Sequence, residues 1–471
     1  MKTECTSEQL SFHALGRRQV IGRFDGGNLS SDAGALLLRE LENRLPILKR
    51  LAACFTDFRH PDWIEHDVPS LLKQRIYALV LGYEDLNDHD ALRHDPLLAL
   101  ACDKSDPQGQ DRLHKRDKGK ALAGKSTLNR LELGNPDKAR EDRYKKIIAD
   151  PDRIDALMVD LFIESHERAP AQIILDIDAT DDPVHGRQEG RFFHGYYKSY
   201  CFLPLYIFCG EQLLCARLRR ADQDASSGTV EELERIVGRI RQAWPTVRIL
   251  LRGDSGFCRD SIMDWCERHQ VDYVLGLAKN ARLNQTMRAE LDRAQSRYEK
   301  SGKAARVFKD FSYRTRDSWS RERRVIGKAE HLPMGANPRY VVTSLPPTIV
   351  RARALYERLY CARGNMENRI KEQQMDLFAD RTSSHTLKAN QLRLYFSSFA
   401  YTLLQTLRRL GLKGTGMDTA QCGTIRLKLF KFAARIQVSV RKVWIAFSQS
   451  YPYHELFERV LENLQRIPLR C

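Results

Sequence analysis

Two acidic residues lie inside the most strongly strand-forming stretch of the chain. Residues 171–180 read AQIILDIDAT, and this isoleucine- and leucine-rich run favours a buried β-strand. Asp176 and Asp178 are two positions apart, so in a strand both side chains leave from the same face. A buried carboxylate is costly unless a metal ion, a basic partner or hydrogen bonds compensate for its lost hydration. The strand therefore predicts a site at which carboxylates carry out chemistry.

The elements that must position these acids follow in a regular order. Strands are predicted at 200–209 and 212–219, then a helix at 226–244, a strand at 247–251, a helix at 261–269 and a strand at 273–277. Three strands followed by helix, strand, helix, strand is the order of a ribonuclease-H-like α/β core, a mixed sheet with helical crossovers. The first and fourth strands are neighbours in that sheet. Asp178 and Asp254, which follows the fourth strand, are therefore predicted to meet.

A third acid is expected on a long helix over residues 351–377. Tyr360, Arg363, Glu367 and Lys371 fall on one stripe of this helix. The arginine can orient or balance an acid, and the lysine follows one turn after the glutamate. A solvent-exposed glutamate without a special role is the plain alternative.

Carboxylates from the two strands and the helix suit a hard cation, Mg²⁺ or Mn²⁺, better than zinc. Two such ions about 3.5–4 Å apart can activate a nucleophile and stabilise the leaving oxygen in phosphodiester cleavage. We predict Asp178, Asp254 and Glu367 as the catalytic and metal-binding residues, with two Mg²⁺ ions for which Mn²⁺ can substitute. The supporting residues are Asp176, Tyr360, Arg363 and Lys371.

The composition favours a soluble protein that binds a polyanion. The 471 residues carry a formal net charge of +16, which is typical of nucleic-acid-binding chains. The 11 cysteines are an odd number and form no CxxC pair, which argues against a disulfide framework or a zinc module and favours a cytoplasmic protein. No apolar run is long enough for a membrane span or a signal peptide.

Residues 119–126 fit the phosphate-loop pattern G-x4-G-K-[ST], but the polar, basic residues before them cannot form the buried strand that such a loop requires. No nucleotide cofactor is therefore expected. Ser126 or Thr127 is predicted instead to cap a short basic helix, in which Lys125 and Arg130 can contact DNA phosphates. A solvated basic helix is the alternative.

Basic and aromatic residues alternate within residues 281–350, which are predicted to form a β-rich insertion. Such residues can contact nucleic acid, although the aromatics can equally form the insertion's own core. The predicted DNA-binding residues here are Trp319, Arg321, Arg323 and Arg324, with Trp319 as the candidate for base stacking. A basic amphipathic helix is expected at 424–447.

The three acids lie in motifs that carry a family resemblance. Asp178-Ala179-Thr180, the turn Asp254-Ser255-Gly256-Phe257 and the pattern Tyr360-x2-Arg363-x3-Glu367 resemble the three signatures of DDE transposases from bacterial insertion sequences. The early segments Phe24–Gly27 and Ser31-Asp32 resemble one branch of this group. The family places a lysine seven residues after the glutamate, where this chain has Gln374. We infer that Lys371 takes its place.

The resemblance implies a cut-and-paste transposase of the bacterial cytoplasm, associated with the nucleoid. It would bind double-stranded DNA at the terminal inverted repeats of its element, cleave there, and join the 3′-hydroxyl ends to target DNA. Joining two ends implies at least a homodimer, and a hairpin intermediate with a flipped base is compatible. Two alternatives are a ribonuclease-H-fold nuclease or resolvase without strand transfer, and an inactive DNA-binding regulator.

Four regions are expected from these patterns. They are a helical N-terminal DNA-binding region at 1–165, a catalytic core at 166–280 and 351–410, the insertion at 281–350, and a helical C-terminal region at 411–471.

Overall fold

The computed structural model describes residues 9–138 and 140–469. The chain divides into two compact units, one formed by Met1–Ile148 with Phe399–Cys471 and the other by Ala149–Ser398. The predicted N- and C-terminal regions thus fall largely into one unit, and the core and its insertion fall together into the other. No helix of the described residues is both long and apolar enough to cross a membrane.

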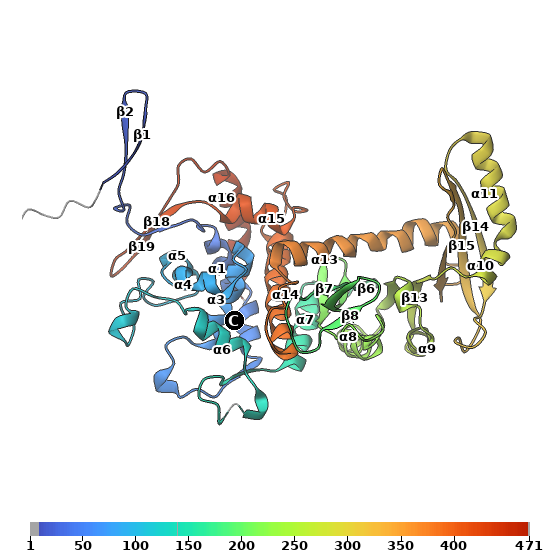
Figure 1. Cartoon of the computed structure of the whole chain (residues 1–471), viewed down its shortest axis with the longest axis horizontal. Helices are drawn as coiled ribbons and strands as arrows, with labels where there is room; N and C mark the ends of the chain where they lie inside the picture. The colour runs from blue at the N-terminus through green and yellow to red at the C-terminus, as the bar shows by residue number, and fades with distance from the viewer. Residues whose placement is uncertain (1–8, 139, 470–471) are drawn as a thin grey trace, which may run out of the picture. The chain divides into compact units, whose positions relative to one another are not determined.

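The unit formed by Ala149–Ser398 is built on one mixed sheet of nine strands among the described residues (Figure 1). Its first five strands are β11 (Gln212–Arg217), β10 (Leu205–Cys209), β6 (Gln172–Ala179), β12 (Arg248–Gly253) and β13 (Val271–Leu277), in that order across the sheet. β10 runs antiparallel to β6 and β11, whereas β6, β12 and β13 are parallel. This is the predicted ribonuclease-H-like arrangement, and the α/β fold class is confirmed.

The insertion does not form a separate β-module, because its strands extend the same sheet. β17 (Arg339–Thr343) pairs antiparallel with β13, β15 (Arg323–Leu332) pairs with β17, and β14 (Ala305–Tyr313) completes the edge. The short β16 (Gly335–Ala336) pairs with β15. Two helices, α10 (Ala281–Thr286) and α11 (Arg288–Ser301), precede these strands. The insertion therefore shares a continuous hydrogen-bonded framework with the catalytic core.

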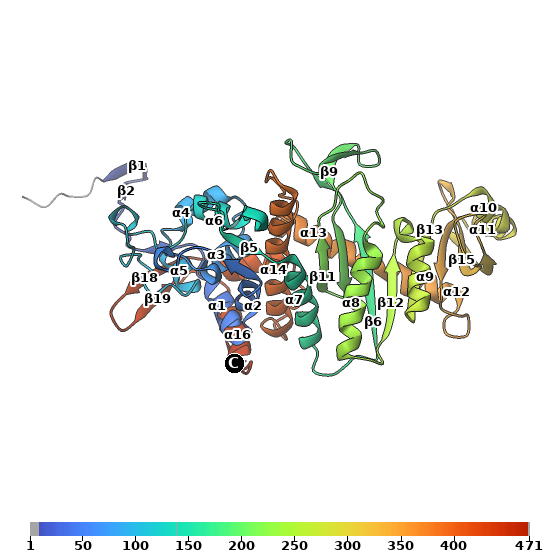
Figure 2. The same cartoon turned by 90° about the horizontal axis from the view of Figure 1, so that it is seen from below.

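Side chains of β6 point alternately to the two faces of the sheet, and the two faces pack in different hydrophobic cores. Ile173, Leu175 and Ile177 pack in the larger hydrophobic core. Helices α7 (Pro151–Glu164), α8 (Thr229–Ala243) and α9 (Asp260–Arg268) contribute apolar residues to that core, and Figure 2 shows them along the sheet. Ile174 packs in a second core with Leu355 and Tyr356. Since side chains alternate along a strand, Asp176 and Asp178 lie on this second face.

The helix predicted over 351–377 is not continuous. It consists of α12 (Ala352–Ala354), a π-helical turn over Leu355–Tyr360, a 3₁₀ turn over Cys361–Arg363 and α13 (Gly364–Leu377). Turns of the π type inside helices are rare and occur often at functional sites. The stripe predicted from regular α-helical spacing is therefore interrupted just before Glu367. The next helix, α14, spans Leu387–Leu410.

The unit containing the N-terminus is mainly helical, as predicted. Its helices are α1 (Ala35–Arg44), α2 (Ile47–Ala52), α3 (Val68–Leu81), α4 (His89–Leu92), α5 (Pro96–Ala101), α6 (Lys125–Glu132), α15 (Cys422–Ile425) and α16 (His454–Gln465). Short strands are β1 (Leu10–Leu15), β2 (Arg18–Gly22), β3 (Leu29–Ser30), β4 (Phe55–Asp57) and β5 (Ile147–Ala149), of which the last ends at the first residue of the other unit.

The prediction of a helix at 424–447 is wrong. After a π-helical turn over Arg426–Phe430, the chain forms β18 (Ala434–Val438) and β19 (Val443–Phe447), which pair with each other and, through β18, with β3. Ala434 and Ile436 are buried while Arg435 and Gln437, which alternate with them, are exposed, and this is the period-two pattern of a strand. The β-branched residues of this segment favour the extended backbone.

Candidate active site and nucleic-acid contacts

Arg363 joins two of the predicted catalytic acids. Asp178 lies next to last in β6, and its Oδ2 accepts a hydrogen bond from Nη1 of Arg363 at 3.1 Å. The other terminal nitrogen of Arg363 donates to Oε1 of Glu367 at 2.9 Å. Asp178 also accepts a hydrogen bond from the backbone nitrogen of Ala179 at 2.9 Å. A strand and a helix distant in sequence are thus connected at one point by a single guanidinium.

The register of the sheet brings Asp254 to the same end. β12 runs parallel to β6 with Gly253 opposite Ile177, so Asp254 is aligned with Asp178 on the neighbouring strand. Adjacent strands are about 4.8 Å apart. Asp254 begins the 3₁₀ turn Ser255–Phe257, and its Oδ1 accepts a hydrogen bond from the nitrogen of Gly256 at 2.8 Å. The turn fixes the carboxylate at the end of the strand.

The three acids share one electrostatic environment. Burial raises the pKa of Asp178 to about 6; the positive charge of Arg363 opposes this shift, and the negative charges of Asp254 and Glu367 add to it. Glu367 is the most open of the three, with 47% of its side chain exposed. The acids therefore lie close enough to influence one another, with Arg363 as their counter-charge.

Tyr360 packs against a glycine that the sequence patterns did not single out. A Cβ atom on Gly276 of β13 would lie 2.6 Å from the hydroxyl of Tyr360 and 2.8 Å from the nitrogen of Ser255. Only glycine therefore permits the ring and the turn after Asp254 to approach β13 this closely. A glycine inside a strand pattern is a known sign of a close approach by another part of the chain. The position of Gly276 inside the predicted strand could therefore have indicated this contact.

Asp176 is held apart from the acid cluster by its own partner. It is 4% exposed, and it forms a two-pronged ion pair with Arg252, at 2.6 Å from Nε to Oδ1 and 2.7 Å from Nη2 to Oδ2. Arg252 also donates to the carbonyl of Leu359 at 2.7 Å. Burial raises the pKa of Asp176, and Arg252 opposes that shift. Sequence reasoning missed Arg252, whose role depends on the pairing of β12 with β6.

Lys371 and Gln374 lie differently with respect to the acids. Lys371 is exposed on α13 and makes no hydrogen bond or ion pair with any residue in the described part of the chain. Gln374 donates through Nε2 to the carbonyl of Asp181 at 3.1 Å, just beyond the end of β6. Gln374 thus anchors α13 to the chain that follows the catalytic strand, whereas the structure does not bring Lys371 into contact with the acids.

The ring of Trp319 is not available for stacking in this structure. Trp319 is 4% exposed and belongs to the larger hydrophobic core, where its ring meets Tyr313 edge-on at 5.8 Å. Arg323 lies over the indole at 5.7 Å. A base cannot stack on a ring covered in this way. The prediction of Trp319 as a stacking residue is therefore wrong, and the alternative of an aromatic core for the insertion describes it.

Two of the three predicted DNA-binding arginines in the insertion are engaged inside the protein. Arg323 is 4% exposed and pairs with Asp260 at 2.6 Å and Glu267 at 2.8 Å. Arg324 pairs with Asp310 and donates to the carbonyls of Leu345 and Val350. Only Arg321 keeps 55% of its side chain exposed. The first two serve the packing of the sheet, because carboxylates and carbonyls already satisfy them.

Lys125 and Arg130 lie on α6, which begins at Lys125 after Gly124 without a side-chain cap. The predicted caps, Ser126 and Thr127, are therefore wrong, although the helix itself is confirmed. The described element directly before the motif at 119–126 is the 3₁₀ turn Lys115–Asp117 and not a strand, so the phosphate-loop fold is absent there. Lys125 donates to Asn87 at 3.1 Å and lies 3.4 Å from Asp90.

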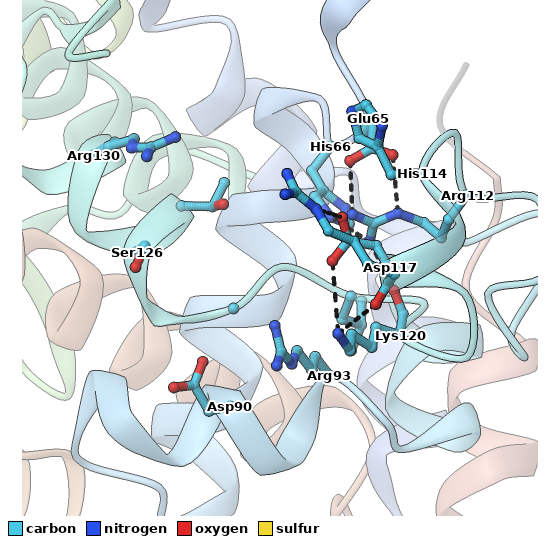
Figure 3. A pocket seen from close by; sticks show the side chains of 14 residues that line it. Glu65, His66, Asp90, Arg93, Arg112, His114, Asp117, Lys120, Ser126 and Arg130 are labelled. Carbon is cyan, nitrogen blue, oxygen red and sulfur yellow. Dashed lines mark hydrogen bonds and ion pairs between the residues drawn. The ribbon is translucent and has the colours of Figure 1, made fainter.

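A polar pocket of about 320 Å³ opens beside α6 (Figure 3). Its charged lining consists of Arg93, Arg112, Arg116, Lys120 and Arg130 with Glu65, Asp90 and Asp117. Arg112 is held by Glu65 at 2.7 Å and donates to His66 at 2.8 Å. Within the described residues, Arg93 makes no side-chain hydrogen bond or ion pair, and its Nε is buried without a partner. The pocket thus contains positive charge that internal carboxylates do not neutralise.

Comparison with known proteins agrees with the motifs. The family model "Transposase DDE domain group 1" matches residues 12–469. No curated protein matches the chain. Among solved structures, a piggyBac transposase in a synaptic complex with hairpin DNA, determined by cryo-electron microscopy, is 11% identical, with a TM-score of 0.40 and coverage of 94% of this chain and 83% of that one. Since the family model spans nearly the whole sequence, the chain belongs to the DDE transposases.

Proposed function

We propose that this protein is the transposase of an insertion sequence, which cleaves the ends of its element and joins the 3′-hydroxyl ends to target DNA. The observation that carries the proposal is the linkage of Asp178 and Glu367 through Arg363, with Asp254 aligned on the neighbouring strand. Carboxylates gathered at one end of such a sheet need a compensating cation. The role proposed for them is phosphodiester chemistry.

The three acids would hold two divalent cations, Mg²⁺ with Mn²⁺ as a substitute. Within residues 9–138 and 140–469, no group of three or more His, Cys, Asp and Glu side chains is close enough to hold an ion as it stands. The donor set nevertheless fits, since it consists of carboxylate oxygens, and the guanidinium of Arg363 already supplies a positive charge between two of them. When bound, the ions supply activation of the nucleophile and stabilisation of the leaving oxygen.

The chain's own residues would prepare this site before DNA arrives. Arg363 screens the repulsion between Asp178 and Glu367. The pair of Asp176 with Arg252 fixes the end of β6 and, through Leu359, the turn that carries Tyr360. A ligand set held by such supporting contacts is positioned more accurately than one on free loops.

The pocket beside α6 would bind a phosphate of the DNA backbone. Arg93 and Arg130 line it, and neither makes an ion pair with another residue in the described part of the chain, although Arg130 also lies over the ring of Tyr144 at 4.4 Å. Ser126 and Thr127 add hydroxyl donors to the lining. Arginine recognises phosphate through several hydrogen bonds at once. The proposed ligands are the terminal inverted repeats and target DNA. Because two ends must be joined, the active form is at least a homodimer, acting in the bacterial cytoplasm at the nucleoid.

One experiment separates this function from its rivals. An oligonucleotide duplex carrying the element's end is incubated with the protein and Mg²⁺, and a pre-cleaved end is incubated with supercoiled plasmid. A transposase cleaves the first and joins the second to the plasmid. Cleavage without joining would identify a nuclease or resolvase, and binding without either reaction would identify an inactive regulator.

A further inference from the structure

A buried acid lies four residues after Asp178 and lacks a regular hydrogen-bond partner. Asp182 begins the first strand of a small sheet in which β7 (Asp182–Pro183), β9 (Ser199–Phe202) and β8 (Phe192–His194) pair in that order. It is 1% exposed, and neither Oδ1 nor Oδ2 makes a regular hydrogen bond within the described part of the chain. Burying a carboxylate without a partner is costly. Asp182 therefore requires a compensating group.

Two further buried oxygen atoms near Asp182 also lack partners. Thr382 is 4% exposed and Tyr206 0% exposed, and neither hydroxyl has a regular hydrogen bond among the described residues. Tyr206 of β10 pairs with Asp178 of β6, so its side chain lies on the face of the sheet that carries the acids. The Thr382 hydroxyl is close enough to lower the pKa of Asp182, although the two groups are not aligned for a regular hydrogen bond. Buried oxygens gathered in this way indicate a group held between them.

The charges around Asp182 favour a cation over a proton as that group. Burial raises the pKa of Asp182 well above its usual range, and the negative charges of Asp380 and Asp181 add to the shift. Burial also raises the pKa of Tyr206, and the charges of Asp182 and Asp380 again add to it. Arg381 opposes the raised pKa of Asp380, but the charges that act on Asp182 are those of the two acids. A proton on Asp182 would leave the charge of Asp380, whereas a divalent cation balances both.

We propose that Asp182 and Asp380 bind one divalent cation outside the catalytic site. The hydroxyls of Thr382 and Tyr206 supply further oxygens, to the ion or to a water bound to it. Oxygen atoms of this kind are the ligands of a hard cation such as Mg²⁺ or Ca²⁺. The inference does not rest on the proposed function, because its ligands are separate from the three catalytic acids.

The ion would tie together three segments that are distant in sequence. Asp182 lies on β7 and Tyr206 on β10, whereas Asp380 and Thr382 follow the end of α13. The hydrogen bond of 3.1 Å from Gln374 of α13 to the carbonyl of Asp181 already joins two of these segments beside the site. A cation here would fix the chain that leaves the catalytic strand to the helix that carries Glu367.

Counting bound Mn²⁺ tests the site in the full-length protein without DNA. The background is the triple variant Asp178→Asn, Asp254→Asn and Glu367→Gln, in which the catalytic acids have lost their charges. Electron paramagnetic resonance measures free Mn²⁺ and so gives the number of ions bound per chain. We expect one bound ion, and we expect Asp182→Asn to weaken its binding at least about tenfold, because even a supporting contact of a metal site contributes that much.

A second measurement is the effect of Mn²⁺ on urea unfolding. An ion that binds only the folded chain stabilises it. Mn²⁺ should therefore raise the urea midpoint of the triple variant and leave that of the Asp182→Asn protein unchanged. Asp222→Asn is the matched control, because Asp222 is an acid already paired with Arg220 at 2.7 Å. In the same background it should bind Mn²⁺ as the triple variant does.

Thr382→Val keeps the shape of the side chain and removes one hydroxyl, and it should also weaken Mn²⁺ binding. This variant decides the question if circular dichroism shows that Asp182→Asn does not fold. Absence of bound Mn²⁺ in the triple variant overturns the inference. Unchanged binding by a folded Asp182→Asn protein, or by Thr382→Val in its place, overturns it as well and assigns a proton to Asp182.

Discussion

Asp176 is clamped by Arg252 through two hydrogen bonds of 2.6 and 2.7 Å, although Asp178 on the same face of the same strand pairs with Arg363 instead. Two acids that look equivalent in sequence thus have different tasks. One holds the end of β6 in place, and the other faces the remaining acids. The difference arises from the register of β12, which sets Arg252 opposite Asp176.

Breaking this pair should destabilise the protein strongly. Arg252→Met leaves the 4%-exposed Asp176 without a counter-charge, and the loss of one partner of a buried pair costs about 3–5 kcal/mol. Urea unfolding of the full chain measures this loss in the free energy of unfolding. Arg321→Met removes an arginine whose side chain is 55% exposed and should cost under about 1 kcal/mol. Equal losses in the free energy of unfolding for the two variants would contradict a structural role for Asp176.

Arg363 should compete with metal ions for the acids. Arg363→Ala removes the guanidinium that binds both Asp178 and Glu367, so we expect Mn²⁺ to bind the DNA-free variant on the order of tenfold more tightly, about 1.4 kcal/mol. Isothermal titration calorimetry gives both affinities. Arg353→Ala, which removes a 74%-exposed arginine paired with Glu357, should bind as the parent does. Weaker binding by Arg363→Ala would show that the arginine organises the ligands instead.

Trp319 should matter for folding and not for stacking. Its side chain is buried in the larger hydrophobic core, so Trp319→Ala should lower the free energy of unfolding by about 3–5 kcal/mol. Trp319→Phe should lower the free energy of unfolding by less. Gel-shift binding of an end duplex by Trp319→Phe should match that of the parent. A large loss of binding by this conservative variant would restore Trp319 as a DNA contact.

Two buried histidines should make the N-terminal unit sensitive to acid. Burial lowers the pKa of His66 and of His89 to about 3, from 6.5. Between these pH values the unfolded chain takes up protons that the folded chain does not, so the free energy of unfolding falls as the pH decreases from 6.5 towards 3. Each histidine contributes up to about 1.4 kcal/mol per pH unit.

Urea unfolding at pH 7.0 and 5.5 tests this linkage. His89→Gln should show a smaller fall between the two pH values than the parent. His60→Gln is the control, since 60% of the His60 side chain is exposed, and it should keep the parent's pH dependence. An unchanged dependence in His89→Gln would mean that His89 is protonated in the folded protein.

The sequence was sufficient for the parts of the fold that depend on local pattern. The hydrophobic period predicts the apolar run before Asp178, the strand before Asp254 and the helix between them to within a few residues. The family motifs then placed Arg363 and Glu367 at the same site. No sequence pattern predicts that the pKa of Asp178 is raised to about 6, because this shift arises from burial in the folded chain.

What could not be predicted depends on pairing across long distances. The partnership of Arg252 with Asp176 requires the register of two strands, and that of Arg324 with Asp310 requires the pairing of β14 with β15. The basic residues near Arg435 fit either a helix or a strand, so charge alone does not predict which of the two forms. Composition alone does not show which aromatic residues form a core, so the sequence fits Trp319 equally to base stacking and to the core of the insertion.

The most direct test is the cleavage of an end duplex by isosteric variants of the three acids. Asp178→Asn, Asp254→Asn and Glu367→Gln each preserve the size and shape of the side chain while removing one metal-binding charge. Glu357→Gln is the control, because Glu357 is paired with Arg353 and is not one of the three predicted metal ligands. We expect each of the three variants to lose Mg²⁺-dependent cleavage by at least about a thousandfold, as is typical of a catalytic metal ligand, while gel-shift binding and the control remain at the parent's level. Cleavage at the parent's rate by any one of the three would contradict its role as a metal ligand.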